Sequence, residues 1–225
     1  MCSQRAVDAG QLAFGFLEQP LGSSRKYTTG TRGYPIARAM LDCHLLCVKA
    51  RLHLHELRGE VSHTVTVAIL EHGTVRVLER LLGYRGHARL GLAIGAVSRL
   101  PAHCTGLGKA LLANLPEAKS QAIVSGLELN RVGPNTIMRK AELNRELAQI
   151  RDVGFAVENE ELVAGVLSSA APIRAVDELL GAVDVSAPMS LIDRKALIEQ
   201  CGPHLLAASE RITSALNTNQ SEEDQ

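Results

Sequence analysis

The chain has 225 residues, and its 24 Lys and Arg side chains equal its 24 Asp and Glu side chains in number, so its formal net charge is zero. Hydrophobic residues at 46% and charged residues at 21% are typical of a globular protein, and neutrality argues against the basic surface that DNA-binding domains usually carry. Aromatic residues at 3% argue against stacking platforms for single-stranded nucleic acids, and charges interrupt every apolar stretch before it could span a membrane.

The first 35 residues are expected to form a small separate segment. Their N-terminus lacks the apolar core of a signal peptide, so we expect a cytoplasmic protein. A turn-rich stretch from Glu18 to Arg25 separates the apolar residues 12–17 from Tyr27-Thr28-Thr29, which has β propensity. This pattern predicts two short strands around a turn.

A long helix is predicted next. Apolar residues recur at helical spacing from Ile36 to Leu57, and neither Pro nor Gly lies between Ile36 and Arg58. We interpret residues 36–58 as a linker helix that joins the N-terminal segment to the main domain, residues 59–216.

The main domain mixes strands and helices. A strand over 64–70, a turn at His72-Gly73 and a strand over 75–81 form a predicted hairpin, and Ala88–Ile94 is a candidate third strand. We predict helices at 105–115 and 138–152, strands at 155–157, 163–171 and 179–186, and a helix over 191–216 interrupted at Gly202-Pro203. The polar residues 217–225 are expected to form a disordered tail. The pattern predicts an α+β fold with an antiparallel sheet flanked by helices.

A glycine-rich helix start is the first candidate for chemistry. Gly106-Leu107-Gly108-Lys109 resembles a phosphate loop, but His103 and Ala110 stand where that loop needs Gly and Ser or Thr. Two interpretations stay open: a turn that requires glycine geometry, and a helix N-terminus whose free N–H groups hold a carboxylate.

The cysteines and histidines give no catalytic or metal pattern. Cys43 and Cys47 share a helix face, but His44 points elsewhere, and no second ligand pair completes a zinc set. Neighbours such as His103 and Cys104 point to opposite faces of an extended segment, which is unsuitable for a nucleophile–base dyad. The five cysteines are scattered and favour reduced thiols. We therefore expect neither an enzyme nor a cofactor.

Polar residues interrupt two predicted strands and directly follow a third, where a solvated turn is the other interpretation. Glu158 begins an acidic cluster, Ser168 and Ser169 interrupt an apolar run, and Asp184 lies between valines and alanines. A polar side chain that faces the interior of a sheet needs a partner, which can be backbone, water or a ligand. Together with the helix start at Gly106, these positions predict a small-molecule site.

The amino-acid sequences of several segments resemble those of one protein family. The block from Leu100 to Ala113 (LPAHCTGLGKALLA) is similar to the signature of the isocitrate-lyase-regulator (IclR) family of bacterial transcription factors. The similarity continues with kept spacing through Gly154-Phe155-Ala156, Gly165-Val166 and Ala170-Ala171-Pro172-Ile173, and it covers about residues 12–216.

The resemblance implies a GAF-like effector-binding domain that binds a small organic or aromatic acid, controls a catabolic operon and assembles as a homodimer or tetramer. Carried over by position, the effector-binding residues would be Leu92, Gly106, Leu107, Glu158, Ser168, Asp184 and Ser186. Several family members have Asp, Cys and Ser where this chain has Glu158, Ser168 and Asp184. The negative charge of Asp184 would disfavour a carboxylate unless it is protonated or paired.

The resemblance also implies a winged helix-turn-helix, of which only the last part is recognisable. Residues 12–18 and 27–30 resemble the wing hairpin, where Arg25 and Lys26 are candidates for DNA contact. The eleven residues before Leu12 are too few for the preceding helices. A late start codon, truncation and a loss of DNA reading all remain open, and we expect DNA binding only if a complete helix-turn-helix is supplied.

Two hypotheses follow. The first is an IclR-type regulator that senses an acidic metabolite and transmits binding through the linker helix. The second is a stand-alone ligand-binding domain that acts through oligomerisation without recognising DNA.

Overall fold

The structure, a computed structural model, describes residues 17–18, 28–29, 44–84, 98–175 and 178–223. The chain divides into two compact units, Met1–Val48 and Lys49–Gln225. In the first unit, β1 (Leu17–Glu18) pairs antiparallel with β2 (Thr28–Thr29), as the predicted pair of strands requires. Arg25 and Lys26 lie outside the described residues.

The second unit is built on a six-stranded sheet with the strand order β5-β4-β3-β8-β7-β6. Every neighbouring pair is antiparallel. The strands are β3 (Thr64–Glu71), β4 (Thr74–Leu81), β5 (Arg99–Pro101), β6 (Ala156–Asn159), β7 (Val166–Ala175) and β8 (Glu178–Pro188). The α+β class with an antiparallel sheet is confirmed.

The β3–β4 hairpin turns where the sequence predicts. His72 and Gly73 both have positive φ, 50° and 76°, which matches the right-handed twist of the two strands in a tight hairpin. The candidate third strand, Ala88–Ile94, lies outside the described residues. A strand that was not predicted, β5, pairs with β4; it is short and ends at Pro101, which suits only an edge position.

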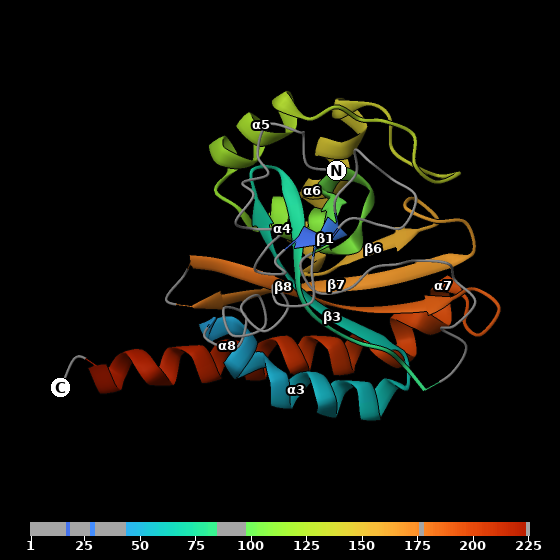
Figure 1. Cartoon of the computed structure of the whole chain (residues 1–225). Helices are drawn as coiled ribbons and strands as arrows, with labels where there is room; N and C mark the ends of the chain where they lie inside the picture. Colours follow the sequence, from blue (N-terminus) through green and yellow to red (C-terminus); the bar gives the residue numbers. More distant parts are fainter. Residues whose placement is uncertain (1–16, 19–27, 30–43, 85–97, 176–177, 224–225) are drawn as a thin grey trace. The chain divides into compact units, whose positions relative to one another are not determined.

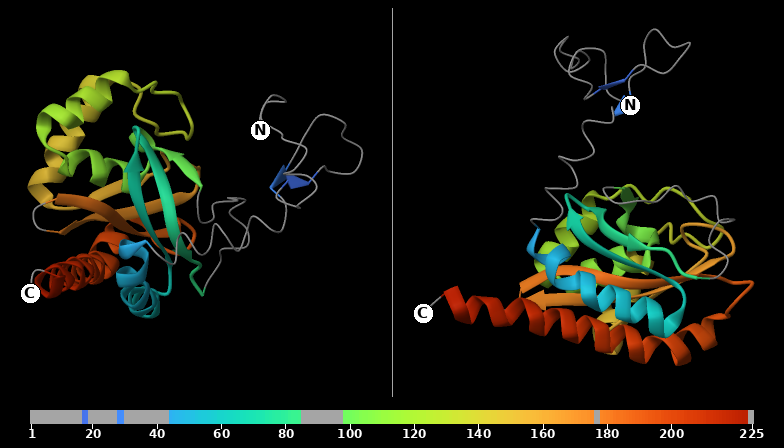
Figure 2. Two further views of the ribbon diagram at one scale, coloured as in Figure 1. Left: turned by 60° about the vertical axis from the view of Figure 1, so that its left-hand side comes forward. Right: turned by 60° about the horizontal axis from the view of Figure 1, so that its bottom comes forward.

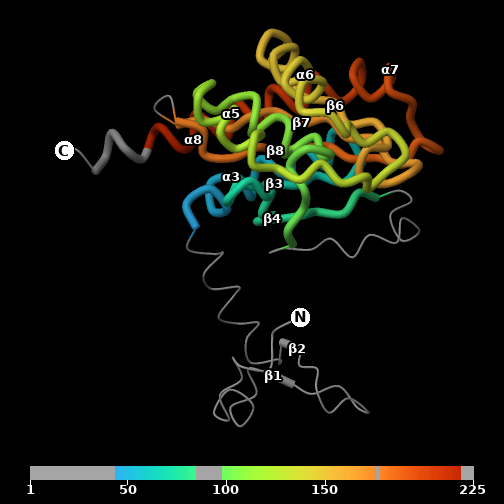
Figure 3. The backbone as a smooth tube through the Cα atoms, turned by 90° about the horizontal axis from the view of Figure 1, so that it is seen from above, coloured from blue at the N-terminus to red at the C-terminus, as the bar shows by residue number. Residues whose placement is uncertain are grey.

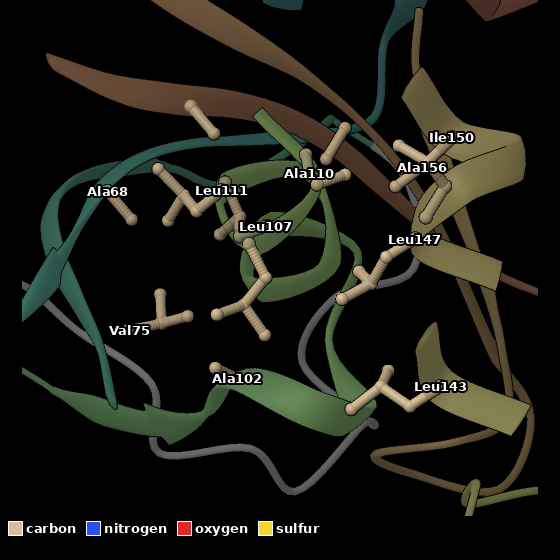
Figure 4. Close-up of a cluster of buried hydrophobic side chains, with 14 of the residues drawn as sticks. Ala68, Val75, Ala102, Leu107, Ala110, Leu111, Leu143, Leu147, Ile150 and Ala156 are labelled. Carbon is tan, nitrogen blue, oxygen red and sulfur yellow. The ribbon is translucent and has the colours of Figure 1, made fainter. Parts of the chain in front are cut away.

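Three helices cover one face of the sheet (Figure 1). They are α4 (Gly106–Asn114), α5 (Glu117–Gly126) and α6 (Lys140–Val153), with the 3-10 turn η2 (Ala102–Cys104) leading into α4. Leu107 and Leu111 of α4 pack between the sheet and Leu143 and Leu147 of α6, and all four are nearly or fully buried (Figure 4). This core fixes α4 against β7 and β8.

The opposite face carries α3 (Leu45–Val61) and α8 (Gly202–Glu223). From Lys49 onward α3 lies beside α8, which packs on β7 (Figures 1 and 2). Glu60 Oε2 lies 3.2 Å from Nδ1 of His204 and 3.8 Å from Nη2 of Arg211, so a hydrogen bond and an ion pair join the two helices. Seen from the α5 side, α8 continues past the edge of the sheet (Figure 3).

Three predicted helix limits are wrong. His44 is not helical and α3 runs on to Val61, since it accommodates Gly59 and ends only at Ser62, which has a φ of 60°. The break expected at Gly202-Pro203 lies just before these residues. It is a π-helical turn at Leu197–Cys201 between α7 (Arg194–Ala196) and α8, and this turn accommodates Pro203, which has no backbone N–H to donate. The tail expected to be disordered continues α8 to Glu223, because extending a formed helix costs far less than nucleating one.

No helix among the described residues is long and apolar enough to cross a membrane.

Candidate functional site

The start of α4 is set by Thr105. This residue has extended backbone angles, and its side-chain oxygen accepts a hydrogen bond of 3.1 Å from the backbone N–H of Gly108. Its hydroxyl donates in turn to the carbonyl of Pro101 at 3.0 Å. An N-cap of this kind ends the preceding turn and leaves the first N–H groups of the helix available to an anion.

The two glycines of α4 serve different contacts. A Cβ on Gly108 would lie 2.2 Å from the carbonyl oxygen of Ala102, so a side chain there would collide with backbone. A Cβ on Gly106 would lie 2.7 Å from Oγ of Ser168 and 3.7 Å from Cβ of Glu158. Gly108 is therefore required by a close approach of backbone and not by a left-handed turn, while Gly106 brings the helix N-terminus directly over polar residues of the sheet.

Those polar residues form two neighbouring rows on the face of the sheet toward α4. In one row Thr64, Ser186, Ser168 and Glu158 lie opposite one another on β3, β8, β7 and β6. In the other row Arg80, Thr66, Asp184 and Ala170 are opposite on β4, β3, β8 and β7. Cross-strand alignment thus gathers side chains from distant parts of the chain into one area.

A pocket with an empty volume of about 560 Å³, its open mouth included, lies between these rows and α4. Its lining residues are Thr66, Arg80, Leu100, Thr105, Gly106, Leu107, Glu158, Leu162, Val163, Val166, Ser168, Asp184 and Ser186. Six of the seven candidate effector-binding residues line it, and the seventh, Leu92, lies outside the described residues.

Glu158 is the buried carboxyl group below the helix start. Its Oε1 accepts hydrogen bonds from the backbone N–H groups of Glu161, at 2.6 Å, and Leu162, at 3.1 Å. Burial raises the pKa of Glu158 to about 7, although these hydrogen bonds and the charge of Lys109 act in the opposite direction. Near neutral pH the side chain can therefore be protonated and can donate a hydrogen bond to an anion.

Asp184 lies near a positive charge that the sequence did not reveal. Burial raises the pKa of Asp184 to about 6, while the positive charge of Arg80 and hydrogen bonds from Thr66 lower it. Burial in turn lowers the pKa of Arg80, and the charge of Asp184 raises it. The negative charge expected to repel an acidic ligand is thus offset by a guanidinium group.

Arg80 faces the pocket because of a β-bulge. Val67 pairs with Glu79 but Ala68 pairs with Val77, so Leu78 is an extra residue on β4. Simple alternation from Val75 and Val77 would place Glu79 on this face; the extra residue places Arg80 there instead. Bulges leave no clear pattern in a single sequence, which explains why this residue was missed.

A buried ion cluster supports the pocket from behind. Lys109 is fully buried, and its Nζ donates to Glu146 Oε1 and Glu161 Oε1, each at 2.5 Å, and to the carbonyl of Val157 at 2.9 Å. Burial raises the pKa of Glu161, and Lys109 lowers it. Because the N–H of Glu161 also donates to Glu158, the cluster fixes the loop after β6 that binds the pocket carboxyl group.

The described residues contain no group of three His, Cys, Asp or Glu side chains placed to hold a metal ion. Cys104 is buried, and burial with the nearby Glu161 and Glu158 raises the pKa of its thiol to about 12, which disfavours the reactive thiolate. The adjacent His103 is buried too, and its Nε2 lies 3.1 Å from the carbonyl oxygen of Asn130. These side chains are structural.

The sequence matches the family model for the C-terminal region of the bacterial transcriptional regulator IclR over residues 38–214. A relative named as the transcriptional regulator SauR, from Cupriavidus necator, is 32% identical over 160 residues, which are 71% of this chain and 62% of that protein. The chain spans less than two thirds of the length of the curated relatives it matches. Those relatives are regulators, not enzymes.

Solved structures give the same result. A transcriptional regulator from Rhodococcus sp. RHA1 has a TM-score of 0.80 and 27% identity, with 92% of this chain and 81% of that chain covered. An IclR homologue from Microbacterium hydrocarbonoxydans, solved in complex with 4-hydroxybenzoate, has a TM-score of 0.73 and 26% identity, with coverage of 92% and 82%. The chain belongs to the IclR family of bacterial transcriptional regulators.

Proposed function

We propose that residues 59–216 sense a small organic or aromatic acid and that the pocket below α4 is the effector site. The observation that carries the proposal is the N-terminus of α4, brought by Gly106 to contact distance from Ser168. Helix N-terminal N–H groups and their dipole favour a negatively charged group. The carboxylate of the effector would lie there, with Ser168, Ser186 and protonated Glu158 as further donors.

The remainder of the pocket supports a compact organic acid. Leu100, Leu107 and Val163 supply apolar wall, and the hydroxyl groups lie on the sheet. A homologue has been solved with 4-hydroxybenzoate, an aromatic acid with one carboxylate. This chemistry supports an acid with a short apolar body as the effector here.

The regulatory output would be transcription of a catabolic operon. Effector binding would favour one of two arrangements of the domain and so alter assembly through α3. Recognition of DNA would be supplied by a complete helix-turn-helix in the functional regulator. An exposed apolar stripe on α3, formed by Leu45, Val48 and Leu52, favours assembly and keeps open the second hypothesis, a domain that acts through oligomerisation alone.

A thermal-shift screen of small aliphatic and aromatic carboxylates tests the effector site. A ligand at about 100 times its Kd should stabilise the chain by about 2.7 kcal/mol. Glu158→Ala and Ser168→Ala should abolish that shift, whereas Glu128→Ala, at an exposed position, should retain it. A stabilising acid whose shift survives both pocket substitutions would place the effector elsewhere.

Mobility-shift assays distinguish the two outputs. The chain, alone and joined to any helix-turn-helix encoded in frame upstream, is mixed with DNA from its own promoter region. An effector-dependent shift of the joined protein supports transcriptional control. No shift from either protein, with effector-dependent changes in oligomer mass, supports the second hypothesis.

A further inference from the structure

Two buried polar atoms of the pocket have no hydrogen-bond partner within the part of the chain that the structure describes. They are Nε of Arg80, a donor, and Oδ1 of Asp184, an acceptor. Both residues line the effector pocket. Buried donors and acceptors are nearly always paired in folded proteins. A donor and an acceptor left together in one pocket therefore indicate a bound group that can pair with both.

The register of the sheet places this pair beside the proposed carboxylate site. Arg80, Thr66 and Asp184 lie opposite one another across β4, β3 and β8. Asp184 also lies opposite Ala170 of β7, and a Cβ on Gly106 would lie 3.5 Å from Cβ of Ala170. Asp184, the nearer of the two residues, thus lies one strand spacing, about 5 Å, from the strand under the N-terminus of α4. A small molecule can contact both places at once.

We propose that the effector carries, besides its carboxylate, a neutral hydroxyl or amide group, and that Asp184 and Arg80 select for this group. The inference rests on the proposed function. The O–H or N–H of the group donates to Oδ1 of Asp184, and its oxygen accepts from Nε of Arg80. Neither protein residue changes its charge on binding.

Other second groups fit less well. A second carboxylate presents only acceptors, so it would set oxygen against oxygen at Asp184. An ammonium group presents only donors, so it would leave Nε of Arg80 unpaired and add a positive charge beside the guanidinium. A methyl group pairs with neither atom, and a site built to hydrogen-bond a substrate group rejects the analogue that lacks it. A hydroxyl or amide group satisfies both atoms.

Isothermal titration of the full chain at about pH 7.5 tests the selection with matched acids. The pairs are 4-hydroxybenzoate against benzoate and lactate against propionate. For at least one pair, the hydroxylated acid should bind at least about tenfold more tightly, as expected for a buried hydrogen bond to a charged group. Asp184→Ala and Arg80→Met should each reduce this preference to within about threefold.

Two further variants keep the test decisive. Asp184→Asn has the same shape and serves if Asp184→Ala does not fold; it too should weaken the preference, because the charged acceptor is lost. Glu178→Gln, an exposed acidic position on the same strand, should leave the preference intact. Equal affinities within every pair that binds, or a preference that survives the pocket substitutions, would overturn the selection and leave the acid site standing. Binding of no acid from either pair would overturn both.

Discussion

At the scale of single residues, the pocket is defined by buried charge. Glu158 and Asp184 lie on one face of the sheet, and both are almost fully buried. Glu158 accepts hydrogen bonds from backbone N–H groups, and Asp184 is stabilised by hydrogen bonds from Thr66 and by the charge of Arg80. Ionised carboxyl groups in such places carry a desolvation cost, and that cost makes stability and ligand affinity depend on pH.

Stability should fall as the pH rises from about 4.5 to about 7. The pKa of Glu158 is about 7 in the folded chain against a usual 4.5, so the folded state holds the proton over that range while the unfolded state releases it. At about 1.4 kcal/mol for each pH unit, Glu158 alone contributes a loss of roughly 3 kcal/mol across the range. In urea unfolding, the free energy of unfolding of Glu158→Gln should change less with pH than that of the unsubstituted chain. Glu128→Gln should show the same pH dependence as the unsubstituted chain.

The same proton should control the affinity for an acid. Below pH 7 the protonated Glu158 can donate to the ligand carboxylate; above pH 7 its negative charge opposes that carboxylate. Affinity should therefore fall by up to about tenfold for each pH unit above 7 if one proton is taken up on binding. Titrations at pH 6, 7 and 8 measure this dependence, and an unchanged affinity would show that the ligand carboxylate lies away from Glu158.

Lys109 should be indispensable for stability. Lys109→Met leaves Glu161 and Glu146 without their cation in a buried cluster, which costs about 3–5 kcal/mol in comparable buried pairs. Lys195→Met, at a position 82% exposed beside Glu199, should change the free energy of unfolding by less than about 0.5 kcal/mol. Urea unfolding measures both. Addition of Glu161→Gln to Lys109→Met should recover part of the loss, and no recovery would show that packing, not charge, explains the effect.

At the scale of elements, α4 combines two requirements in one helix. Gly108 allows the helix to approach the turn before it, and Gly106 allows its N-terminus to approach the sheet. The first contact is with backbone, which cannot move aside, and the second is with the hydroxyl of Ser168, which can rotate. Substitutions at the two glycines should therefore have different consequences.

Gly108→Ala should destabilise the chain strongly, whereas Gly106→Ala should mainly abolish effector binding. A control is Gly59→Ala in α3, where a Cβ meets nothing within 4 Å; it should stabilise by about 0.5–1 kcal/mol, since alanine is the better helix former. Thermal unfolding and ligand titration separate the effects. Wild-type affinity in Gly106→Ala would contradict the proposed carboxylate site.

Elements could be predicted from sequence where periodicity was strong. The β3–β4 hairpin and the central helices α4 and α6 lie within a few residues of their predicted limits. Polar α5 was missed because only Ser120 and Val124 are buried, so it has no clear apolar face. Glu158, Ser168 and Asp184 were identified from polar residues in or beside apolar strands and then by resemblance, and Ser186 by resemblance alone. Arg80 was missed, because the bulge at Leu78 reverses the alternation on which prediction depends.

At the scale of the whole molecule, α3 carries an unusual surface. Leu45, Val48 and Leu52 are 47%, 50% and 64% exposed, and their spacing is that of a coiled-coil seam. The apolar residues on its other side, among them Leu54 and Leu57, are buried. A helix whose inner apolar side is buried and whose outer apolar side is exposed can bind a partner on the outer side.

Leu52→Glu should reduce the oligomer mass of the chain, because it places a charge at the most exposed position of this stripe. Val132→Glu, at a loop position 47% exposed, should leave the mass unchanged. Light scattering coupled to size-exclusion chromatography measures both. A monomeric unsubstituted chain at tens of micromolar, or an unchanged mass in Leu52→Glu, would show that α3 is not the interface.

Each central strand serves two separate purposes through alternate residues. On β8, Asp184 and Ser186 face the pocket, while Val183, Val185 and Ala187 are buried and alternate with them. A change of ligand preference in evolution can therefore proceed by replacing every second residue, while the intervening ones continue to hold the sheet on α8. Related regulators can therefore diverge in the ligand they bind while they conserve their fold. Chimaeras that exchange only the pocket-facing residues should transfer the ligand preference without disturbing the fold.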